Sequence, residues 1–182
     1  MSNSADPRTD IDLMTALQSG DQDALAVLIR RYQPGLVNFF RRMGASIVAT
    51  EDLVQETFLR LFRYREKYRP TGRFVGLLFV MARHALADAQ RASMRDERNI
   101  RERAATTDMA AFDRTAVRMD MQEALAGLSE KLRIVVVLNA YQGMKLQEIA
   151  DVLDIPVGTV KSRLHLAMNR LSDILGGDYG TE

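Results

Sequence analysis

Hydrogen-bond donors and positive charges recur at helical spacing between Pro156 and Leu171, a segment that contains no acidic residue. If the segment is a helix, these residues share its outer side and apolar residues share the other. The outer side carries Lys161, Ser162, His165, Leu166 and Asn169, flanked by Arg163 and Arg170. All of these side chains except Leu166 can donate to phosphates or base edges, and the DNA major groove admits a helix. The pattern suits noncovalent DNA binding, but a surface helix of any bundle would show the same periodicity, so periodicity alone does not decide between the two.

A second candidate is the acidic pair Asp52 and Glu56, which would lie one turn apart on a helix. Two carboxylates can do acid–base chemistry in a pocket. Nothing in the surrounding sequence indicates a pocket, and acids at this spacing are usually solvated. The chain has no cysteine and only two histidines, His84 and His165, which are too few for a zinc centre. We therefore expect no catalytic residue, no metal, no cofactor and no enzyme activity.

Two helices and a tight turn must position the basic face. A short first helix is predicted by an apolar stripe at helical spacing, which consists of Leu146, Ile149, Ala150 and Leu153. The sequence Asp154-Ile155-Pro156 then interrupts this helix, because the residue before a proline is pushed out of the α region. Proline itself is well accommodated in a first helical turn, so the second helix begins near Pro156. This arrangement is a helix-turn-helix.

A family resemblance of this unit is carried by the segment EIADVLDIPVGTVKSRLHLAMNRL. It closely resembles the last conserved region of bacterial sigma factors of the extracytoplasmic-function (ECF) group, which typically reads EIA-x-x-L-x-IPVGTVKSRLxRAxxRL. The resemblance implies that the unit reads the −35 promoter element. The −35 residues implied are Thr159, Lys161, Ser162, Arg163, His165, Leu166, Asn169 and Arg170, of which Arg163 and Arg170 lie nearer phosphates. The sequence departs from the family at Leu166 and Met168, where arginines are frequent, so this helix carries less charge.

Turn and capping residues divide the first half of the chain into several predicted helices. A short helix is expected from Asp10 to Gln18, and Asp21 or Asp23 can cap the next one. Pro34-Gly35 marks a break or a new start. Residues 44–50 read as a connection that ends on Thr50, the expected cap of a long helix with two acids in its first turn.

The long helix carries a second resemblance. Its segment DLVQETFLRLFR is similar to the D-x-x-Q-x-x-F segment of the same sigma family, which belongs to the domain that holds core RNA polymerase. The resemblance implies that Asp52, Gln55 and Glu56 contact the helical clamp of the largest polymerase subunit. Arg60 lies on the same outer side and is included in this core-polymerase-binding set. The two motifs occur in the family's order, and together they cover most of the chain.

The loop from Tyr68 to Arg73 and the helix after it resemble the segment that engages the −10 element in this family. Arginines and aromatic rings stack on unpaired bases, and a basic groove follows the backbone. The −10 DNA-binding residues predicted here are Tyr68, Arg69, Thr71, Arg73, Arg83 and His84. Phe74, by contrast, is expected in the core.

Basic side chains are concentrated in the middle of the chain. Residues 59–103 hold twelve basic and five acidic side chains, although the formal net charge of the chain is only +1. Residues 92–113 are charged and lack a bulky apolar stripe, which predicts a linker that is partly helical or disordered. A helix is expected from Arg114 to Ala126, and Ser129 is expected to cap another one. No apolar run reaches the roughly 18 residues of a membrane span, and the polar N-terminus is not a secretory signal.

We therefore predict an all-α fold of two small helical domains joined by a flexible linker, the C-terminal one a helix-turn-helix. By resemblance, residues 8–94 are sigma region 2, residues 95–113 the linker and residues 114–176 sigma region 4. The predicted function is promoter-specific transcription initiation in the cytoplasm as a dissociable subunit of core RNA polymerase, held through the clamp helices and flap. Promoter DNA is the second partner, and an anti-sigma factor, common in the group, is a candidate third.

Two alternatives remain open at this point. A free-standing helix-turn-helix regulator would use the same C-terminal unit on duplex DNA without polymerase, and it would have no use for the DLVQETF face. A helical adaptor or enzyme subunit would need a pocket with perturbed groups or a metal cluster. Retention of promoter DNA, by the chain alone or only with polymerase, separates these classes.

Overall fold

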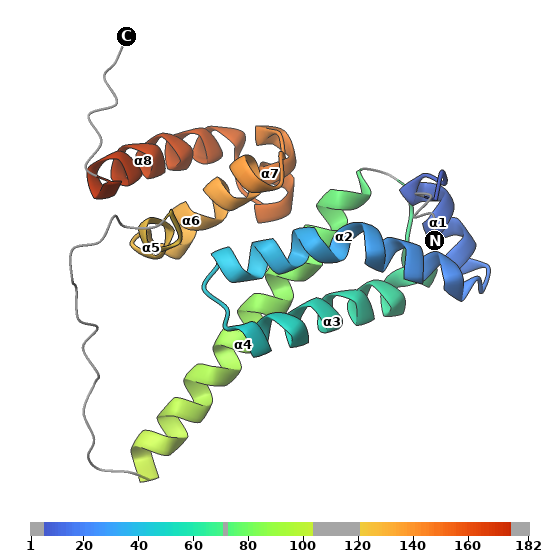
Figure 1. Cartoon of the computed structure of the whole chain (residues 1–182), viewed down its shortest axis with the longest axis horizontal. Helices are drawn as coiled ribbons and strands as arrows, with labels where there is room; N and C mark the ends of the chain where they lie inside the picture. Colours follow the sequence, from blue (N-terminus) through green and yellow to red (C-terminus); the bar gives the residue numbers. More distant parts are fainter. Residues whose placement is uncertain (1–5, 71–72, 104–120, 176–182) are drawn as a thin grey trace, which may run out of the picture.

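The computed structural model describes residues 6–70, 73–103 and 121–175, and within these ranges the regular elements are all helical (Figure 1). The first unit contains α1 (Asp10–Gln18), α2 (Gln22–Arg42), α3 (Ile47–Tyr64), the 3-10 turn η1 (Arg65–Lys67) and α4 (Phe74–Arg103). The second unit contains α5 (Met121–Ala126), α6 (Glu130–Val136), the π-helical turn η2 (Val137–Tyr141), α7 (Leu146–Leu153) and α8 (Val157–Leu175). The predicted all-α class with two helical units is confirmed.

The first unit is built around three long helices. Figure 1 shows α2 and α3 side by side, with α4 running diagonally across them. Their shared interior holds a cluster of aromatic rings, in which Phe39 lies 5.2 Å from Phe40 and 5.3 Å from Phe79 between ring centroids. Edge-to-face rings of this kind add to the gain from apolar burial. Phe74 is also buried, as the sequence predicted.

Two predicted boundaries in this unit are wrong. Helix α2 continues without a break through Pro34, because residues on both sides of the proline, including Leu28 and Leu36, are fully buried in one core. This packing offsets the loss of a backbone hydrogen bond, which costs about 3 kcal/mol in a helix interior. Helix α3 begins one turn earlier than expected. Its cap is Ser46, whose hydroxyl accepts from the Ala49 N–H at 3.2 Å, whereas Thr50 is buried inside the helix.

The second unit is the expected helix-turn-helix. Asp154 ends α7 in the left-handed region at φ 54°, and the Ile155 N–H then donates to the Ala150 carbonyl at 3.1 Å. Pro156 follows, and α8 begins at Val157. Upstream, the β-branched run that starts at Ile134 is helical and buried, so tertiary packing overrides its strand propensity.

The two units pack against each other. One apolar cluster contains core residues of both, among them Phe40 of α2 and Val137 of η2. Polar contacts extend it. Gln142 Nε2 donates to the Gly35 carbonyl at 3.2 Å, and the Arg42 guanidinium lies 3.5 Å from the centroid of the Tyr141 ring. Gly35 suits this approach, because a Cβ there would come within 3.2 Å of the Gln142 side chain.

Helix α4 extends to Arg103, so its last turns occupy residues that the sequence assigned to the linker. The remaining linker residues, 104–113, lie outside the described ranges. The helix predicted from Arg114 is described only from Met121 onward, as α5.

Candidate nucleic-acid interface and docking surface

The outer face of α8 presents the predicted −35 residues to solvent. Lys161, Ser162, His165, Leu166, Asn169 and Arg170 are exposed, whereas Thr159 and Arg163 are half-buried. Val160, Ala167 and Leu171 point inward and are buried, which fixes the rotation of the helix. Within α8 the hydroxyl of Ser162 donates to the Thr159 carbonyl at 3.1 Å, and the Asn169 amide nitrogen lies 3.4 Å from His165 Nε2. The face can therefore offer donors, acceptors and positive charge to a DNA groove.

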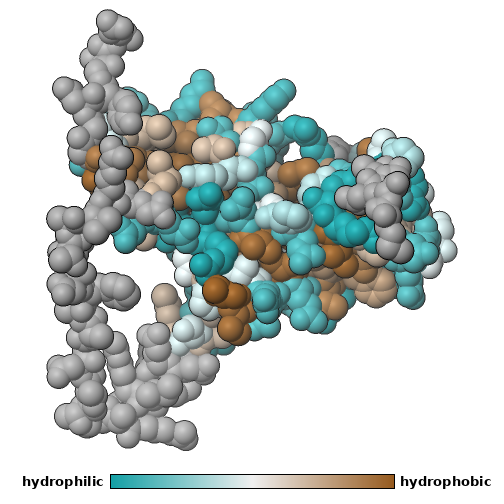
Figure 2. Space-filling model, in the orientation of Figure 1, coloured by the Kyte–Doolittle hydropathy of each residue, from teal (hydrophilic) through white to brown (hydrophobic). Residues whose placement is uncertain are grey.

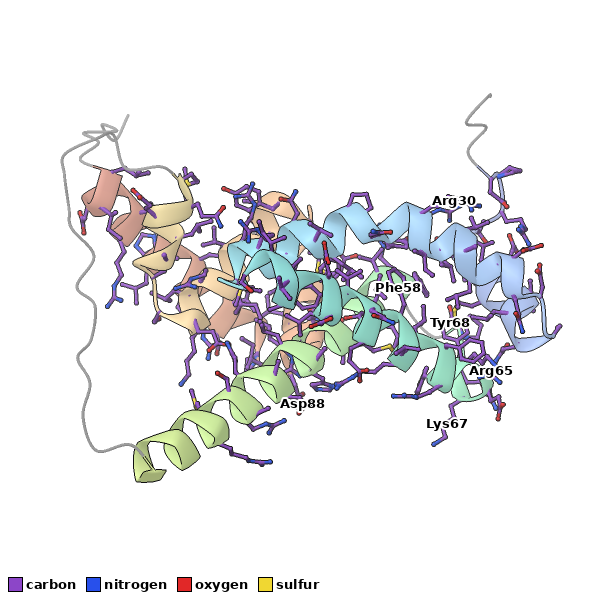
Figure 3. All side chains as sticks on the ribbon, turned by 60° about the horizontal axis from the view of Figure 1, so that its bottom comes forward. Arg30, Phe58, Arg65, Lys67, Tyr68 and Asp88 are labelled. Carbon is purple, nitrogen blue, oxygen red and sulfur yellow. The ribbon has the colours of Figure 1, made fainter. Side chains whose placement is uncertain are left out.

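The predicted docking residues on the outer face of α3 differ in whether their side chains form ion pairs. Asp52 and Gln55 are exposed, and the structure gives their side chains no ion pair among the described residues. Arg60 is engaged, because its guanidinium bonds Glu56 at 2.7 Å and reaches Asp88 of α4 at 2.9 Å. Figure 3 shows Asp88 part-way along α4. Arg60 thus ties α3 to α4, and Glu56 bonds it within α3. Asp52 and Gln55 are the members of the predicted docking set that remain exposed for a partner.

An apolar groove runs beside these two residues, between α2 and α3. Its volume is about 350 Å³. The lining residues are Ile29, Gln33, Val37, Glu51, Val54, Gln55, Phe58 and Leu59. Figure 2 shows a hydrophobic patch along this face, and Val37 and Leu59 are large apolar residues exposed there. Gln55 is both a groove residue and a predicted docking residue, so the polar and apolar parts form one continuous surface.

Helix α1 forms hydrogen bonds to the backbone at the start of the loop that is predicted to meet −10 DNA. Gln18 Nε2 donates to the carbonyls of Arg65 at 2.8 Å and Tyr68 at 3.1 Å. Tyr68 is only 4% exposed and points beneath α2 (Figure 3), so in this arrangement its ring packs inside the unit and cannot stack on a base. Burial raises the pKa of its hydroxyl. Arg69 remains exposed, and Thr71 lies outside the described residues.

Arg73 connects this loop to the second unit. Its guanidinium forms an ion pair with Glu148 of α7. The pKa of the Glu148 carboxyl is lowered first by the Lys145 backbone N–H, which donates to it at 2.8 Å, and then by Arg73. Beside the pair is a cavity of about 300 Å³ whose walls come from both units and include Tyr64, Phe74 and Asp151. The packed arrangement therefore occupies part of the predicted −10 surface.

The last two predicted −10 residues, Arg83 and His84, are neighbours on α4. Arg83 is half-buried and His84 is exposed, with 3.1 Å between Arg83 Nη2 and His84 Nε2. The pKa of His84 is lowered, first by burial and then by the charge of Arg83. The lowered pKa favours the neutral form of His84, in which one ring nitrogen donates a hydrogen bond and the other accepts one.

Sequence reasoning missed the residues that connect distant elements. Gln18, Asp88 and Glu148 each bond a predicted site residue or its backbone from another helix. No local pattern could have found them, since their partners lie 28 to 75 residues away in the chain.

The described part of the chain contains no cluster of three or more potential metal ligands. Among its helices, none combines the length and apolar character that crossing a membrane requires.

Comparison with known families finds two matches in the order of the chain. Residues 28–96 match Sigma-70 region 2, and residues 118–171 match Sigma-70, region 4. The RNA polymerase sigma factor CarQ of Myxococcus xanthus is 34% identical over 170 residues, which cover 90% of this chain and 95% of CarQ. The ECF RNA polymerase sigma factor SigD of Mycobacterium tuberculosis is 31% identical over 176 residues, which cover 88% of this chain and 82% of SigD.

Solved structures agree with these matches. CnrH, solved in complex with the cytosolic domain of CnrY, superposes with a TM-score of 0.70 at 25% identity and covers 93% of this chain and 97% of CnrH. The sigma factor RpoE of Bartonella quintana, solved with the anti-sigma factor NepR, gives a TM-score of 0.68 at 23% identity. This second likeness covers 82% of this chain and 95% of RpoE, and it supports the fold.

Proposed function

Because the chain belongs to the extracytoplasmic-function group of sigma-70 family sigma factors, we propose that its exposed faces on α3 and α8 divide the work of that class. The chain is a sigma factor, which binds core RNA polymerase and directs promoter-specific transcription initiation. The finer proposal assigns polymerase docking to the first unit and upstream DNA recognition to the second. It rests on one observation above all: both faces lie on the surface of the same chain, in the order of the two family matches.

The docking surface proposed for core polymerase is centred on Asp52 and Gln55 of α3, with Glu56 and Arg60 at its edge. It is supported by the exposure of the first two residues and by the apolar groove beside them. A protein interface needs an apolar centre as well as polar contacts, and the groove between α2 and α3 supplies it. The clamp helices of the largest subunit are the proposed occupant, and the polymerase flap is proposed to hold the second unit.

The −10 surface proposed on the first unit consists of Arg69, Thr71, Arg73, Arg83 and His84, with Tyr68 supporting the loop from inside. Arg73 can meet DNA only after it leaves Glu148, and the proposal includes separation of the two units when the chain binds a promoter. We propose that core polymerase favours the separated form. In that form α8 is free to reach a −35 element at a distance from the −10 loop.

Two further aspects belong to this proposal. Transcription takes place where the chromosome is, so the chain acts in the bacterial cytoplasm as a regulatory subunit, while core polymerase performs the chemistry. An anti-sigma factor is proposed as a third partner, since the similar RpoE was solved in complex with the anti-sigma factor NepR. Such a partner would act by holding the units packed.

A binding experiment tests the proposal against the free-standing regulator. Labelled promoter DNA is titrated with the chain alone, with core polymerase alone, and with both together. The proposal predicts a sequence-specific complex only with both, and loss of that complex for the double variant Asp52→Ala, Gln55→Ala. Specific retention by the chain alone, unchanged in the double variant, would establish the free-standing regulator.

A further inference from the structure

On the outer face of α8, the lysine and arginine side chains are separated from the other residues. With about 100° between successive residues of a helix, Ser162 and Asn169 lie at the centre of this face, and His165 and Leu166 lie within about 50° of it. The cations lie at the flanks, about 90° or more from the centre. They are Lys161 and, on the other side, Arg163 and Arg170. The middle of the face therefore carries no lysine and no arginine.

Leu166 is the apolar member of this central strip, and 46% of its surface is exposed. A single exposed leucine on an arbitrary surface needs no explanation. Here the surrounding residues are polar, the inward positions are filled by Val160, Ala167 and Leu171, and Leu166 contributes to neither apolar core. Its side chain is free to be covered by whatever the face binds.

The chemistry of the major groove restricts what can cover it. Phosphates lie at the groove edges, where the flanking cations can reach them, and the groove floor offers hydrogen-bonding groups to Ser162, His165 and Asn169. The one apolar group on that floor is the C5-methyl of thymine. A leucine cannot bond the acceptors of guanine, and cytosine lacks the methyl, so both are poor partners for it.

We infer that Leu166 reads a thymine in the upstream promoter element through that base's C5-methyl group, and that it is a specificity-determining residue of this chain. The inference rests on the proposed role of α8. It predicts an element in which at least one position opposite the middle of α8 is thymine on one strand, and at which cytosine is rejected.

Replacing thymine by uracil removes only the methyl group, which makes it a direct probe. Holoenzyme assembled from this chain and core polymerase is first used to select duplexes from a randomised library. Each thymine of the selected upstream element is then replaced by uracil in turn. Burying one methyl-sized group changes affinity roughly fourfold. We expect a weakening of about that size at one or two positions for the unaltered chain, and no uracil effect at those positions for Leu166→Ala.

Met168→Ala is the matched control. Met168 is another exposed apolar residue of α8, 57% exposed, but it lies about 160° around the helix from Leu166. Holoenzyme with Met168→Ala must keep the uracil effect. Thermal unfolding of both variants should match the unaltered chain, since neither side chain is in the core.

The outcomes separate this inference from the proposed function. Upstream selectivity without any uracil effect, or with an effect that persists in Leu166→Ala, overturns the inference and leaves the proposed function standing. A holoenzyme that selects no upstream element overturns the proposed function and the inference with it.

Discussion

Arg73, at the entrance to α4, forms an ion pair with Glu148 of α7, and so one residue of the predicted −10 surface is bonded to the helix-turn-helix of the same chain. The pair adds to an apolar interface, which also includes the stacking of Arg42 on Tyr141. Its energetic share is small, because Arg73 is 69% exposed and such pairs contribute about 0–1 kcal/mol. It follows that the packed arrangement is held mainly by apolar contacts. The ion pair makes only a small addition to the free energy that favours the packed form over a separated one.

Replacing Glu148 by glutamine should therefore shift the chain toward the separated form, by up to about fivefold in the ratio of the two forms. The natural chain has no cysteine, so two introduced cysteines, one on α3 and one on α8, can carry spin labels for distance measurement. Asp173→Asn is the control. Asp173 is an exposed acid near the end of α8. Equal distance distributions for Glu148→Gln and the control would show that the ion pair does not stabilise the packed form.

Acid should destabilise the folded chain through the same residue. The pKa of Glu148 is lowered from its ordinary value of 4.5 by the Lys145 N–H and by Arg73. A folded-state pKa below the unfolded one means that the ionised group stabilises the fold above the unfolded pKa, and that this contribution is lost as pH falls through the folded pKa. Unfolding midpoints measured from about pH 6 down to pH 3 should fall less steeply for Glu148→Gln. Parallel curves for the two proteins would contradict this.

The α3 face makes a prediction that separates docking from stability. Asp52→Ala and Gln55→Ala should each weaken binding to core polymerase, by about 1 kcal/mol or more if they lie at the interface centre, and leave the unfolding midpoint unchanged. Arg60→Ala should lower the midpoint, because it breaks the bonds to Glu56 and Asp88. Titration of labelled chain with core polymerase measures the binding. Asp173→Ala, an exposed acid at the end of α8, is the control and should change neither quantity.

On α8, base contacts and phosphate contacts should respond differently to salt. Removing Arg163 or Arg170 should reduce the slope of log affinity against log salt by roughly one each and weaken all sequences alike. Changing His165 should alter sequence preference, at about 1–3 kcal/mol for a good base contact. Binding of holoenzyme to promoter DNA at several salt concentrations checks both. An unchanged slope after loss of the arginines would refute their phosphate role.

Tyr68 should behave as a core residue. Among the described residues its buried hydroxyl has no hydrogen-bond partner, so Tyr68→Phe should leave the stability unchanged or raise it. Tyr68→Ala should lower it by about 3–5 kcal/mol, as for other large core truncations. Chemical denaturation gives both values. Marked destabilisation by the phenylalanine substitution would show that the hydroxyl is bonded.

Local patterns in the sequence predicted much of this structure. The bounds of α1, the cap at Asp21, the turn at Asp154 to Pro156 and the basic face of α8 follow from spacing and from turn chemistry, which act within a few residues. The cap of α3 was missed because Ser46 and Thr50 are both good capping residues, and burial of Thr50 decides between them.

The passage of α2 through Pro34 and the packing of the two units could not be predicted in this way. Both depend on contacts between residues that are distant in the chain, such as Gln142 with Gly35 and Glu148 with Arg73. The same reason explains the candidate site. The exposed residues of α3 and α8 could be read from periodicity, whereas the engagement of Arg60, the burial of Tyr68 and the pairing of Arg73 depend on neighbours that periodicity does not identify.

This chain should confer promoter choice on core RNA polymerase. The decisive measurement is run-off transcription on a library of promoter fragments, with purified core polymerase in the presence and absence of the chain. We expect discrete transcripts from a restricted set of fragments only when the chain is present, and their loss with the Asp52→Ala, Gln55→Ala double variant. The same transcripts from core polymerase with and without the chain would show that the chain does not select promoters.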